Sequence, residues 1–271
     1  MPDTPQTPID LTEYWNRRYD TVDATRSGHI DLPVEYNLWL YRRKQHHARR
    51  ALARVGASLR GARLLEIAAG SGAWMPFWEA QGVSDYCGVD LSERAVEALR
   101  ERFPARRLFT HDLNELHIGT VVGAGYDCVS AIDVLYHVVD DDRFGAVLSD
   151  LASVLKPGGV LLLHDQFLHG APQNYGGYIR WRRLVDYEAA LAAAGFEVLY
   201  RRPTFFFMVQ AADYSGRKAQ LMHAIWDHLT RPAIERAPSA AGALGYAADT
   251  AICSLLRNGP SFNVMVCRKH G

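Results

Sequence analysis

Between residues 63 and 164, short apolar runs alternate with longer amphipathic stretches. The runs cover residues 63–67, 86–89, 107–110, 126–133 and 160–164. Each run has the length and the apolar content of a buried strand, whereas the stretches between them repeat apolar residues at helical spacing. The pattern predicts alternating strands and helices, which build a parallel α/β sheet.

Two further strands are predicted near the end of the chain, at residues 196–201 and 262–267. A helical pattern over 187–194 precedes the first of them and stops at Gly195. Residues 203–261 separate the two strands, which is far more than a hairpin needs. We therefore expect an insert between the last two strands of the sheet.

The insert shows two helical patterns, over residues 214–229 and 243–256. Three residues are predicted to interrupt its helices: Pro232, Pro238 and Gly242. Ligands bind outside the carboxyl ends of the strands in open α/β sheets, so we expect the insert to lie over the active site. The N-terminal region, residues 1–58, is expected to close over the same active site. Together with the insert it would form a helical lid that excludes water.

Composition and charge narrow the class of protein. The chain has 271 residues, 48% of them hydrophobic, and a formal net charge of zero. This suits one sizeable core with elaborations, and it lacks the basic excess of a nucleic-acid footprint. The four cysteines have no metal-ligand spacing, so we expect no metal. No apolar run approaches the roughly 20 residues of a membrane span, and no signal peptide is recognised. We expect a cytoplasmic protein without a membrane or nucleic-acid partner.

A turn of small residues follows the first predicted strand, and an acidic residue follows the second. The turn runs over residues 68–72 and contains Gly70 and Gly72, and the acidic residue is Asp90. Glycines let the backbone approach a nucleoside, and a carboxylate there accepts hydrogen bonds from ribose hydroxyls. A generic turn between strand and helix is the alternative explanation of this motif by itself. The third glycine of a dinucleotide site is absent and Trp74 is bulky, which favours a ligand without a pyrophosphate.

With the rest of the chain, these residues resemble the class I S-adenosylmethionine-dependent methyltransferase family. The family's first motif, an acidic residue followed by alternating glycines, matches residues 66–72, with Ala68 in place of the usual first glycine. The turn Lys156-Pro157-Gly158-Gly159 before the fifth strand is a strong mark of the family. The resemblance spans about residues 60 to 165.

The resemblance implies a Rossmann-like α/β fold. Its seven-stranded sheet would be mostly parallel, with the last strand antiparallel in a slot between the fifth and sixth, and with helices on both faces. Residues 59–271 would form the methyltransferase domain, which includes the insert over 203–261, and residues 1–58 the N-terminal helical lid region.

The resemblance also implies S-adenosylmethionine as the cofactor. Asp90 would bind the ribose, Asp112 would accept a hydrogen bond from the adenine amino group, and Leu91 and Leu113 would pack on the adenine. Asp133 is expected to face the methionine moiety. The full predicted cofactor-binding set is Glu66, Ala68, Gly70, Gly72, Asp90, Leu91, Asp112, Leu113, Asp133, Tyr14, Trp15 and Tyr19.

His137 is the predicted catalytic residue, as a general base or as a group that orients the acceptor. It lies just past the fourth strand, near the expected position of the methyl group, and the ordinary pKa of histidine suits base work near neutral pH. The alternative is a packing role, because a histidine is frequent at this place in family members with unrelated substrates. A base is needed only for an acceptor such as an alcohol.

Aromatic residues in the regions assigned to the lid predict a small apolar or aromatic organic acceptor in specialised metabolism. The predicted substrate-binding residues are Tyr36, Trp39, Tyr136, Tyr178, Phe206 and Tyr214. The alternative is that these residues form the lid's own core. We expect methylation at oxygen, of a hydroxyl or carboxylate. Carbon or nitrogen methylation and a non-catalytic cofactor-binding protein are the alternatives.

A basic run covers residues 41–50. It predicts the solvated face of an amphipathic helix, with Leu38, Tyr41, Gln45, Ala48 and Leu52 on the other face. Binding of RNA or an anionic acceptor is the alternative, which zero net charge disfavours. A homodimer is a further expectation.

Overall fold

The structure is a computed structural model in which residues 10–20 and 28–271 are described. Two parts of the predicted N-terminal lid region, residues 1–9 and 21–27, lie outside the described residues. The remainder of that region forms two helices, α1 (Leu11–Arg18) and α2 (Val34–Arg54).

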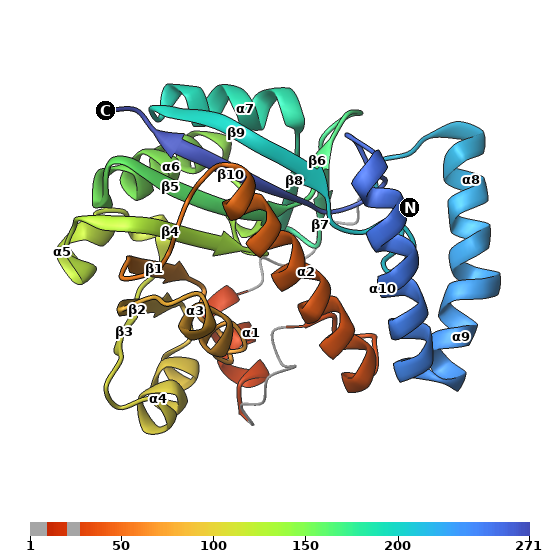
Figure 1. The fold of residues 1–271 in the computed structure, drawn as a ribbon, viewed down its shortest axis with the longest axis horizontal. Coiled ribbons are helices and arrows are strands. Elements are labelled where there is room, and N and C mark those ends of the chain that lie inside the picture. The colour runs from red at the N-terminus through yellow and green to blue at the C-terminus, as the bar shows by residue number, and fades with distance from the viewer. Residues whose placement is uncertain (1–9, 21–27) are drawn as a thin grey trace.

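A seven-stranded sheet crosses the molecule in the order β3-β2-β1-β4-β5-β10-β9 (Figure 1). Its strands are β1 (Arg63–Ile67), β2 (Asp85–Asp90), β3 (Arg107–Thr110), β4 (Tyr126–Ile132), β5 (Leu155–Asp165), β9 (Phe196–Pro203) and β10 (Asn263–Lys269). The pairs among β1 to β5 are parallel, whereas β10 runs antiparallel to both β5 and β9. The predicted Rossmann-like sheet is confirmed, including the last strand in its slot.

Helices cover both faces of the sheet because each strand is apolar on both sides. In β5, Leu161 and Leu163 join one buried cluster, whereas Val160 and Leu162 join the other, as the alternation of a strand requires. The first cluster packs under α5 (Ile118–Val122), α6 (Asp141–Val154) and α7 (Leu184–Ala193). The second packs under α2, α3 (Met75–Ala80) and α4 (Glu93–Arg102).

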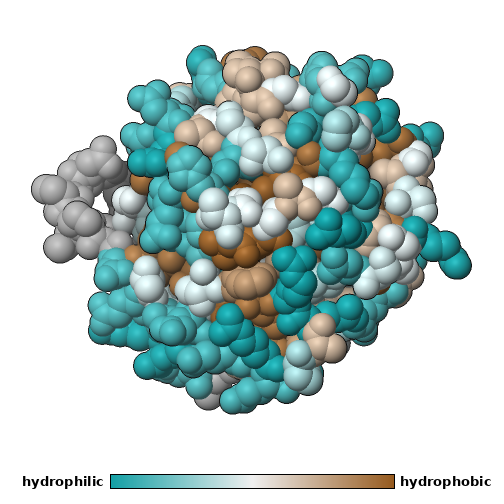
Figure 2. Space-filling model, turned by 90° about the vertical axis from the view of Figure 1, so that its left-hand side faces the viewer, coloured by the Kyte–Doolittle hydropathy of each residue, from teal (hydrophilic) through white to brown (hydrophobic). Residues whose placement is uncertain are grey.

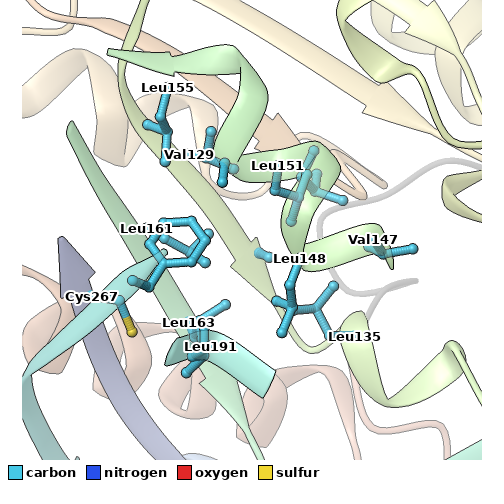
Figure 3. Close-up of a cluster of buried hydrophobic side chains, with 14 of the residues drawn as sticks. Val129, Leu135, Val147, Leu148, Leu151, Leu155, Leu161, Leu163, Leu191 and Cys267 are labelled. Atoms are coloured by element: carbon cyan, nitrogen blue, oxygen red, sulfur yellow. The ribbon is translucent and has the colours of Figure 1, made fainter. Parts of the chain in front are cut away.

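Figure 3 shows the first cluster, which is formed by branched aliphatic side chains from several elements. Leu148 and Leu151 of α6 pack towards Val129 of β4 and Leu161 of β5. Cys267 of β10 lies in the same cluster as a free, fully buried thiol. These contacts fix the strands whose ends carry the candidate site.

Three short strands form a separate small sheet that the sequence patterns did not predict. They are β6 (Phe167–Leu168), β7 (Gln173–Tyr175) and β8 (Ile179–Arg183), in the order β6-β8-β7. Strands this short leave no clear alternation in a sequence. The small sheet contacts the 3₁₀ turn Leu135–His137, so it borders the candidate site.

Residues 204–262, here called the C-terminal helical layer, connect β9 to β10. They contain α8 (Gly216–Ile225), a π-helical turn (Trp226–Thr230), α9 (Arg231–Arg236) and α10 (Pro238–Leu255). The layer stands at one side of the molecule, where α10 lies beside α2 (Figure 1). The predicted helical insert is present.

The predicted interruptions within this layer were right for Pro238 and wrong for Gly242. The chain leaves the helical conformation at Ala237, and Pro238 starts the next helix. Pro232 and Pro238 lie at the first turns of α9 and α10, where a missing N–H costs little. Gly242 lies inside α10, and a Cβ there would be only 2.3 Å from the Trp39 ring of α2. Glycine thus allows two helices to approach closely and does not end one.

The prediction of a solvated basic face on α2 was also wrong in part. Arg43 is fully buried, and its guanidinium donates hydrogen bonds to the carbonyl oxygens of Thr204 (3.0 Å) and Asp249 (2.7 Å). Leu38, placed on the buried face, is 41% exposed. The helix has partners on two sides, which its own periodicity does not show.

Candidate active site

A cavity of about 1000 Å³, counting the space open to solvent, lies at the carboxyl ends of β1 to β4. Nine of the predicted cofactor residues lie in its wall: Trp15, Tyr19, Glu66, Ala68, Asp90, Leu91, Asp112, Leu113 and Asp133. His137 lies there too. Gly70, Gly72 and Tyr14 are outside the wall. The strand ends therefore bring together residues far apart in the sequence.

The turn after β1 depends on left-handed backbone at three positions. Ala68, Gly70 and Gly72 have φ values of 58°, 55° and 75°. Left-handed backbone disfavours a residue with a Cβ, so Ala68 adopts the conformation of the family's glycine at an energetic cost. A Cβ on Gly72 would lie 2.7 Å from the Leu99 side chain of α4. Gly72 thus serves the contact between turn and helix and does not touch the cavity.

Asp90 ends β2 with a buried carboxylate. One oxygen accepts a hydrogen bond from the Gly70 N–H (2.8 Å) and the other from the Ser92 N–H (2.9 Å). Burial raises the pKa of Asp90 to about 6, although hydrogen bonds from backbone N–H groups oppose the rise. Ser92 also caps α4, as its side chain accepts from the Ala95 N–H. The same contacts hold the turn, the helix start and the carboxylate in one arrangement.

Glu66, at the start of the motif, is held from inside the protein. Its Oε2 accepts hydrogen bonds from Trp78 Nε1 (3.0 Å) and the Tyr86 hydroxyl (2.6 Å). Burial raises the pKa of Glu66 to about 8, so the group is largely protonated at neutral pH. A neutral carboxyl in the wall donates as well as accepts.

Asp112 and Leu113 stand after β3 as predicted. The Asp112 carboxylate accepts from the N–H (2.8 Å) and the side-chain amide (2.9 Å) of Asn114, and so caps the 3₁₀ turn Leu113–Glu115. His111, which the motif did not single out, is buried and also lines the cavity.

Aromatic side chains of α1 close one side of the cavity. Trp15 stacks on Tyr19 with ring centroids 5.9 Å apart, and both line the wall. Tyr14 points instead towards Tyr178, at 5.9 Å between centroids. Trp74 and Tyr41 complete the wall, and neither was predicted. Trp74 comes two residues after the glycine turn, and a bulky side chain so close to the turn is the sequence feature that could have placed it in the wall.

Two histidines lie at the ends of β4 and β5. His137 Nδ1 lies 2.9 Å from the Tyr178 carbonyl oxygen, which only accepts, so Nδ1 carries the proton. His164 Nδ1 binds the Asp133 carboxylate, which also forms an ion pair with Lys44. Burial lowers the pKa of both imidazoles, which keeps them neutral near pH 7.

Asp133 joins the groups at the ends of β4 and β5, because its carboxylate binds both His164 and Lys44. Its φ of 56° is left-handed, a conformation that aspartate tolerates better than most residues. Burial alone would raise its pKa, but the charge of Lys44 and the hydrogen bonds from His164 and Lys44 lower the pKa below its ordinary value. Lys44 and His164 were not predicted as site residues. Predicting them would have required knowing that α2 faces the end of β4.

The six predicted substrate residues lie outside the cavity wall. Tyr136 and Tyr178 flank His137, at 4.6 and 6.0 Å between ring centroids. Tyr36 is buried beneath the C-terminal helical layer, where its hydroxyl donates to the Met208 carbonyl oxygen (2.8 Å). Trp39 packs in the same cluster. The remaining two belong to the helical layer itself: Phe206 packs on Phe207, and Tyr214 lies before α8.

The wall suits S-adenosylmethionine by the chemistry of its groups. Asp90 and Asp112 keep lone pairs for hydroxyl or amino donors, and Leu91 and Leu113 offer an apolar slot for a base. The buried Trp74 ring, stacked on Trp78 at 5.5 Å, occupies the region where a dinucleotide fold keeps a third glycine.

The model of a family described as methyltransferase domain matches residues 39–201. The chain belongs to this family. It is an S-adenosylmethionine-dependent methyltransferase. A solved structure of similar fold is magnesium protoporphyrin IX methyltransferase from Synechocystis PCC 6803 with bound S-adenosylmethionine, with a TM-score of 0.53 and 17% identity over 96% of this chain and 95% of that chain.

Two curated relatives match at the level of sequence. The "Probable non-canonical nonribosomal peptide synthetase (NRPS) CymA" of Salinispora arenicola (strain CNS-205) is 28% identical over 237 residues, which is 78% of this chain and 3% of that protein. The dTDP-3-amino-3,4,6-trideoxy-alpha-D-glucopyranose N,N-dimethyltransferase of Streptomyces venezuelae is 27% identical over 37% of this chain and 40% of its own length. The chain thus spans less than half of either relative.

In residues 10–20 and 28–271, none of the helices has the length and apolar character of a membrane span, and no group of three or more His, Cys, Asp or Glu side chains is placed to hold a metal ion. Figure 2 shows one face of the molecule, hydrophilic over most of its rim with hydrophobic residues towards the middle.

Proposed function

We propose that this methyltransferase acts on oxygen, as a hydroxyl or carboxylate, of a small apolar or aromatic organic acceptor in specialised metabolism. The observation that carries the proposal is a neutral histidine of the cavity wall, His137, whose ring packs between aromatic side chains. Trp15 meets its ring edge-on at 5.7 Å, and Tyr178 stacks on it at 6.0 Å. Such surroundings favour a flat, apolar acceptor with one polar group.

In this proposal, the nine cofactor residues of the wall bind S-adenosylmethionine, with Asp90 on the ribose hydroxyls and Asp112 on the adenine amino group. When bound, the cofactor supplies a methyl group on a positively charged sulfonium. A dry pocket that aligns the acceptor with this group provides much of the catalysis by positioning. Asp133, kept ionised by Lys44, would face the methionine end.

His137 is proposed to orient the acceptor. Its Nδ1–H is fixed on the Tyr178 carbonyl oxygen, so its Nε2 is left as a hydrogen-bond acceptor. The aromatic rings that flank it restrict its rotation. A variant His137→Gln should therefore raise the KM for the acceptor several-fold and leave the affinity for S-adenosylhomocysteine unchanged.

The proposed lid follows from the same wall. Leu11 and Trp15 of α1 and Tyr19 just after it line the cavity, which supports the N-terminal region as the part of the chain that closes over the cofactor. No residue of the C-terminal helical layer lines the cavity. We propose that this layer holds α2 in place, with residues 59–271 as the methyltransferase domain. A homodimer and the lack of a nucleic-acid partner stay predictions.

Nitrogen methylation is the second candidate, and the relative from Streptomyces venezuelae favours it, because its name describes an N,N-dimethyltransferase of an amino sugar nucleotide. A neutral histidine suits that reaction as well, since an ammonium group must lose a proton before it can attack.

The test is a screen in which release of S-adenosylhomocysteine is measured with phenols, carboxylic acids and amino sugars as acceptors. Turnover of phenols or carboxylic acids supports the proposal. Turnover confined to amino sugars overturns it in favour of nitrogen methylation. Turnover of RNA alone would overturn the small-molecule class altogether.

A further inference from the structure

Buried polar atoms without a hydrogen-bond partner gather at the carboxyl end of β5. Within the described residues they include His164 Nε2, both amide atoms of Gln166, Trp181 Nε1 and the hydroxyls of Thr204 and Ser261. His164 is 3% exposed and Gln166 is fully buried. Nearly all buried polar atoms in proteins have partners, so a cluster of exceptions requires an explanation. We call these five residues the polar cluster.

Two residues of the polar cluster, His164 and Trp181, pack against the ring of Phe262. This ring stacks on His164 at 5.5 Å with an interplanar angle of 3°, and it lies 6.2 Å from the ring of Trp181. It also lies 6.2 Å from Tyr136, the neighbour of His137. Thr204 joins through its N–H, which donates to the Phe262 carbonyl oxygen (2.8 Å). An aromatic ring with hydrogen-bonding groups around it is thus already part of the protein's own structure.

Asp133 connects the polar cluster to the cavity. It lies in the cavity wall, and its carboxylate holds His164 Nδ1. A carboxylate only accepts, so Nδ1 carries the proton and Nε2 presents its lone pair to the cluster. A carboxylate behind an imidazole fixes its tautomer and stabilises the imidazolium that forms when Nε2 takes a proton.

The charges around His164 balance. Asp133 of β4 faces Lys44 of α2, and each neutralises the other. His47 of α2 also faces this region, and burial lowers its pKa to about 2, so it stays neutral. The guanidinium of Arg43 is bound to backbone carbonyl oxygens. Neither Lys44 nor Arg43 is therefore left to bind a carboxylate acceptor.

We propose that His164, oriented by Asp133, is the general base for a neutral hydroxyl acceptor whose polar group binds between His164 and Gln166. This rests on the proposed function and narrows it to a phenol-like hydroxyl. The acceptor's ring takes the place of Phe262 against the polar cluster. As the acceptor oxygen forms its bond to the methyl carbon, its proton passes to His164 Nε2. The carbon–sulfur bond breaks with its electron pair on sulfur, which leaves neutral S-adenosylhomocysteine, and the imidazolium then releases its proton to water.

The kinetic test compares His164→Gln with His223→Gln, the same change on α8 away from the cavity. His164→Gln should lower kcat for a phenolic acceptor about 100-fold or more. The affinity for S-adenosylhomocysteine and the melting temperature should stay near those of the wild type, and the KM for the acceptor should change much less than kcat. The kcat of the wild type should fall at low pH, and this fall should be absent from the variant. Asp133→Asn should also lower kcat, because an amide no longer fixes the tautomer of His164 as the carboxylate does. Asparagine tolerates the left-handed backbone at this position.

Turnover of His164→Gln within threefold of the wild type would overturn the proposal, and so would equal losses of kcat, cofactor affinity and melting temperature. Turnover of carboxylic acids but not of phenols would overturn the narrowing to a hydroxyl while the proposed function stands.

A binding measurement decides the inference separately from turnover. Phenol is added to the protein bound to S-adenosylhomocysteine, and the ring nitrogens of His164 and the indole N–H of Trp181 are followed by ¹⁵N NMR. Saturable shifts of both signals in the wild type, together with loss of the Trp181 shift in His164→Gln, support the site even if no acceptor is turned over. Unchanged signals at saturating phenol, or a Trp181 shift that persists in His164→Gln, overturn it.

Discussion

The strands that carry the cavity and the C-terminal helical layer lie on two sides of α2, and they are held there in different ways. Tyr41 and Leu52 of α2 pack into the core beside the strands, whereas Tyr36 and Leu40 pack into the cluster of the helical layer. The cavity side is built from local turns, in which a few neighbouring residues fix the geometry. The helical layer depends on contacts between residues that are far apart in the chain.

The largest expected effect is on the side of the helical layer. Arg43→Ala removes the buried guanidinium that bonds Thr204 and Asp249, and it takes one hydrogen-bond donor from each of their carbonyl oxygens. We expect a loss of about 3 kcal/mol in the free energy of unfolding. Hydrogen exchange should show lost protection in residues 204–262 before residues 63–132. Urea unfolding of Arg42→Ala, an exposed neighbour, serves as the control and should differ little from the wild type.

Gly242 offers a second way to separate the two regions. Gly242→Ala places a methyl group against the Trp39 ring, where a Cβ would have only 2.3 Å, and should cost about 1–3 kcal/mol of stability. Gly145→Ala in α6 is the matched control, because no atom lies within 4 Å of its Cβ position. Alanine favours a helix, so the control should be stabilised by roughly 0.5–1 kcal/mol. Equal changes in melting temperature for the two variants would refute the contact.

On the cavity side, the pH dependence of S-adenosylhomocysteine binding reports the protonation of Asp90. Its pKa of about 6 lies above the ordinary value because it is buried. Below this pH the carboxyl is protonated and accepts ribose hydroxyls less well. The dissociation constant of S-adenosylhomocysteine should thus be flat above pH 7 and rise by up to about tenfold per pH unit below 6. In Asp90→Asn, the dissociation constant should no longer rise below pH 6. If the pH dependence survives this change, another group is responsible for it.

The smallest expected effect concerns the glycine turn. Ala68→Gly removes a Cβ from left-handed backbone at φ 58° and should raise the free energy of unfolding by about 1 kcal/mol. Ala69→Gly, next to it and without a positive φ, should lower it by a similar amount. Thermal unfolding measures the stability of both variants. If Ala68→Gly is less stable than the wild type, the Cβ of Ala68 does not strain the turn.

The same contrast explains what could be predicted from the sequence. Asp90, Asp112 and Ala68 follow predicted strands directly, so strand order alone placed them in the cavity. Lys44 and His164 could not be placed, because their meeting depends on how α2 crosses the sheet. Local periodicity says nothing about such long-range contacts.

The C-terminal helical layer was predicted as helical but misread in detail for the same reason. Gly242 resembles a helix breaker until the Trp39 ring beside it is known. Arg43 resembles a solvated residue until its partners, Thr204 just after β9 and Asp249 of α10, are known. Aromatic residues such as Tyr36 suggested an acceptor site, whereas the structure places them in the layer's own core.

Calorimetric titration of S-adenosylhomocysteine into the wild type and Asp90→Ala tests the central claim most directly, that the cavity at the ends of β1 to β4 binds the cofactor. We expect micromolar affinity for the wild type and a loss of one to two orders of magnitude, about 1.4–2.8 kcal/mol, for the variant. Equal affinity of two folded proteins would contradict the account, because the ribose would then be bound elsewhere.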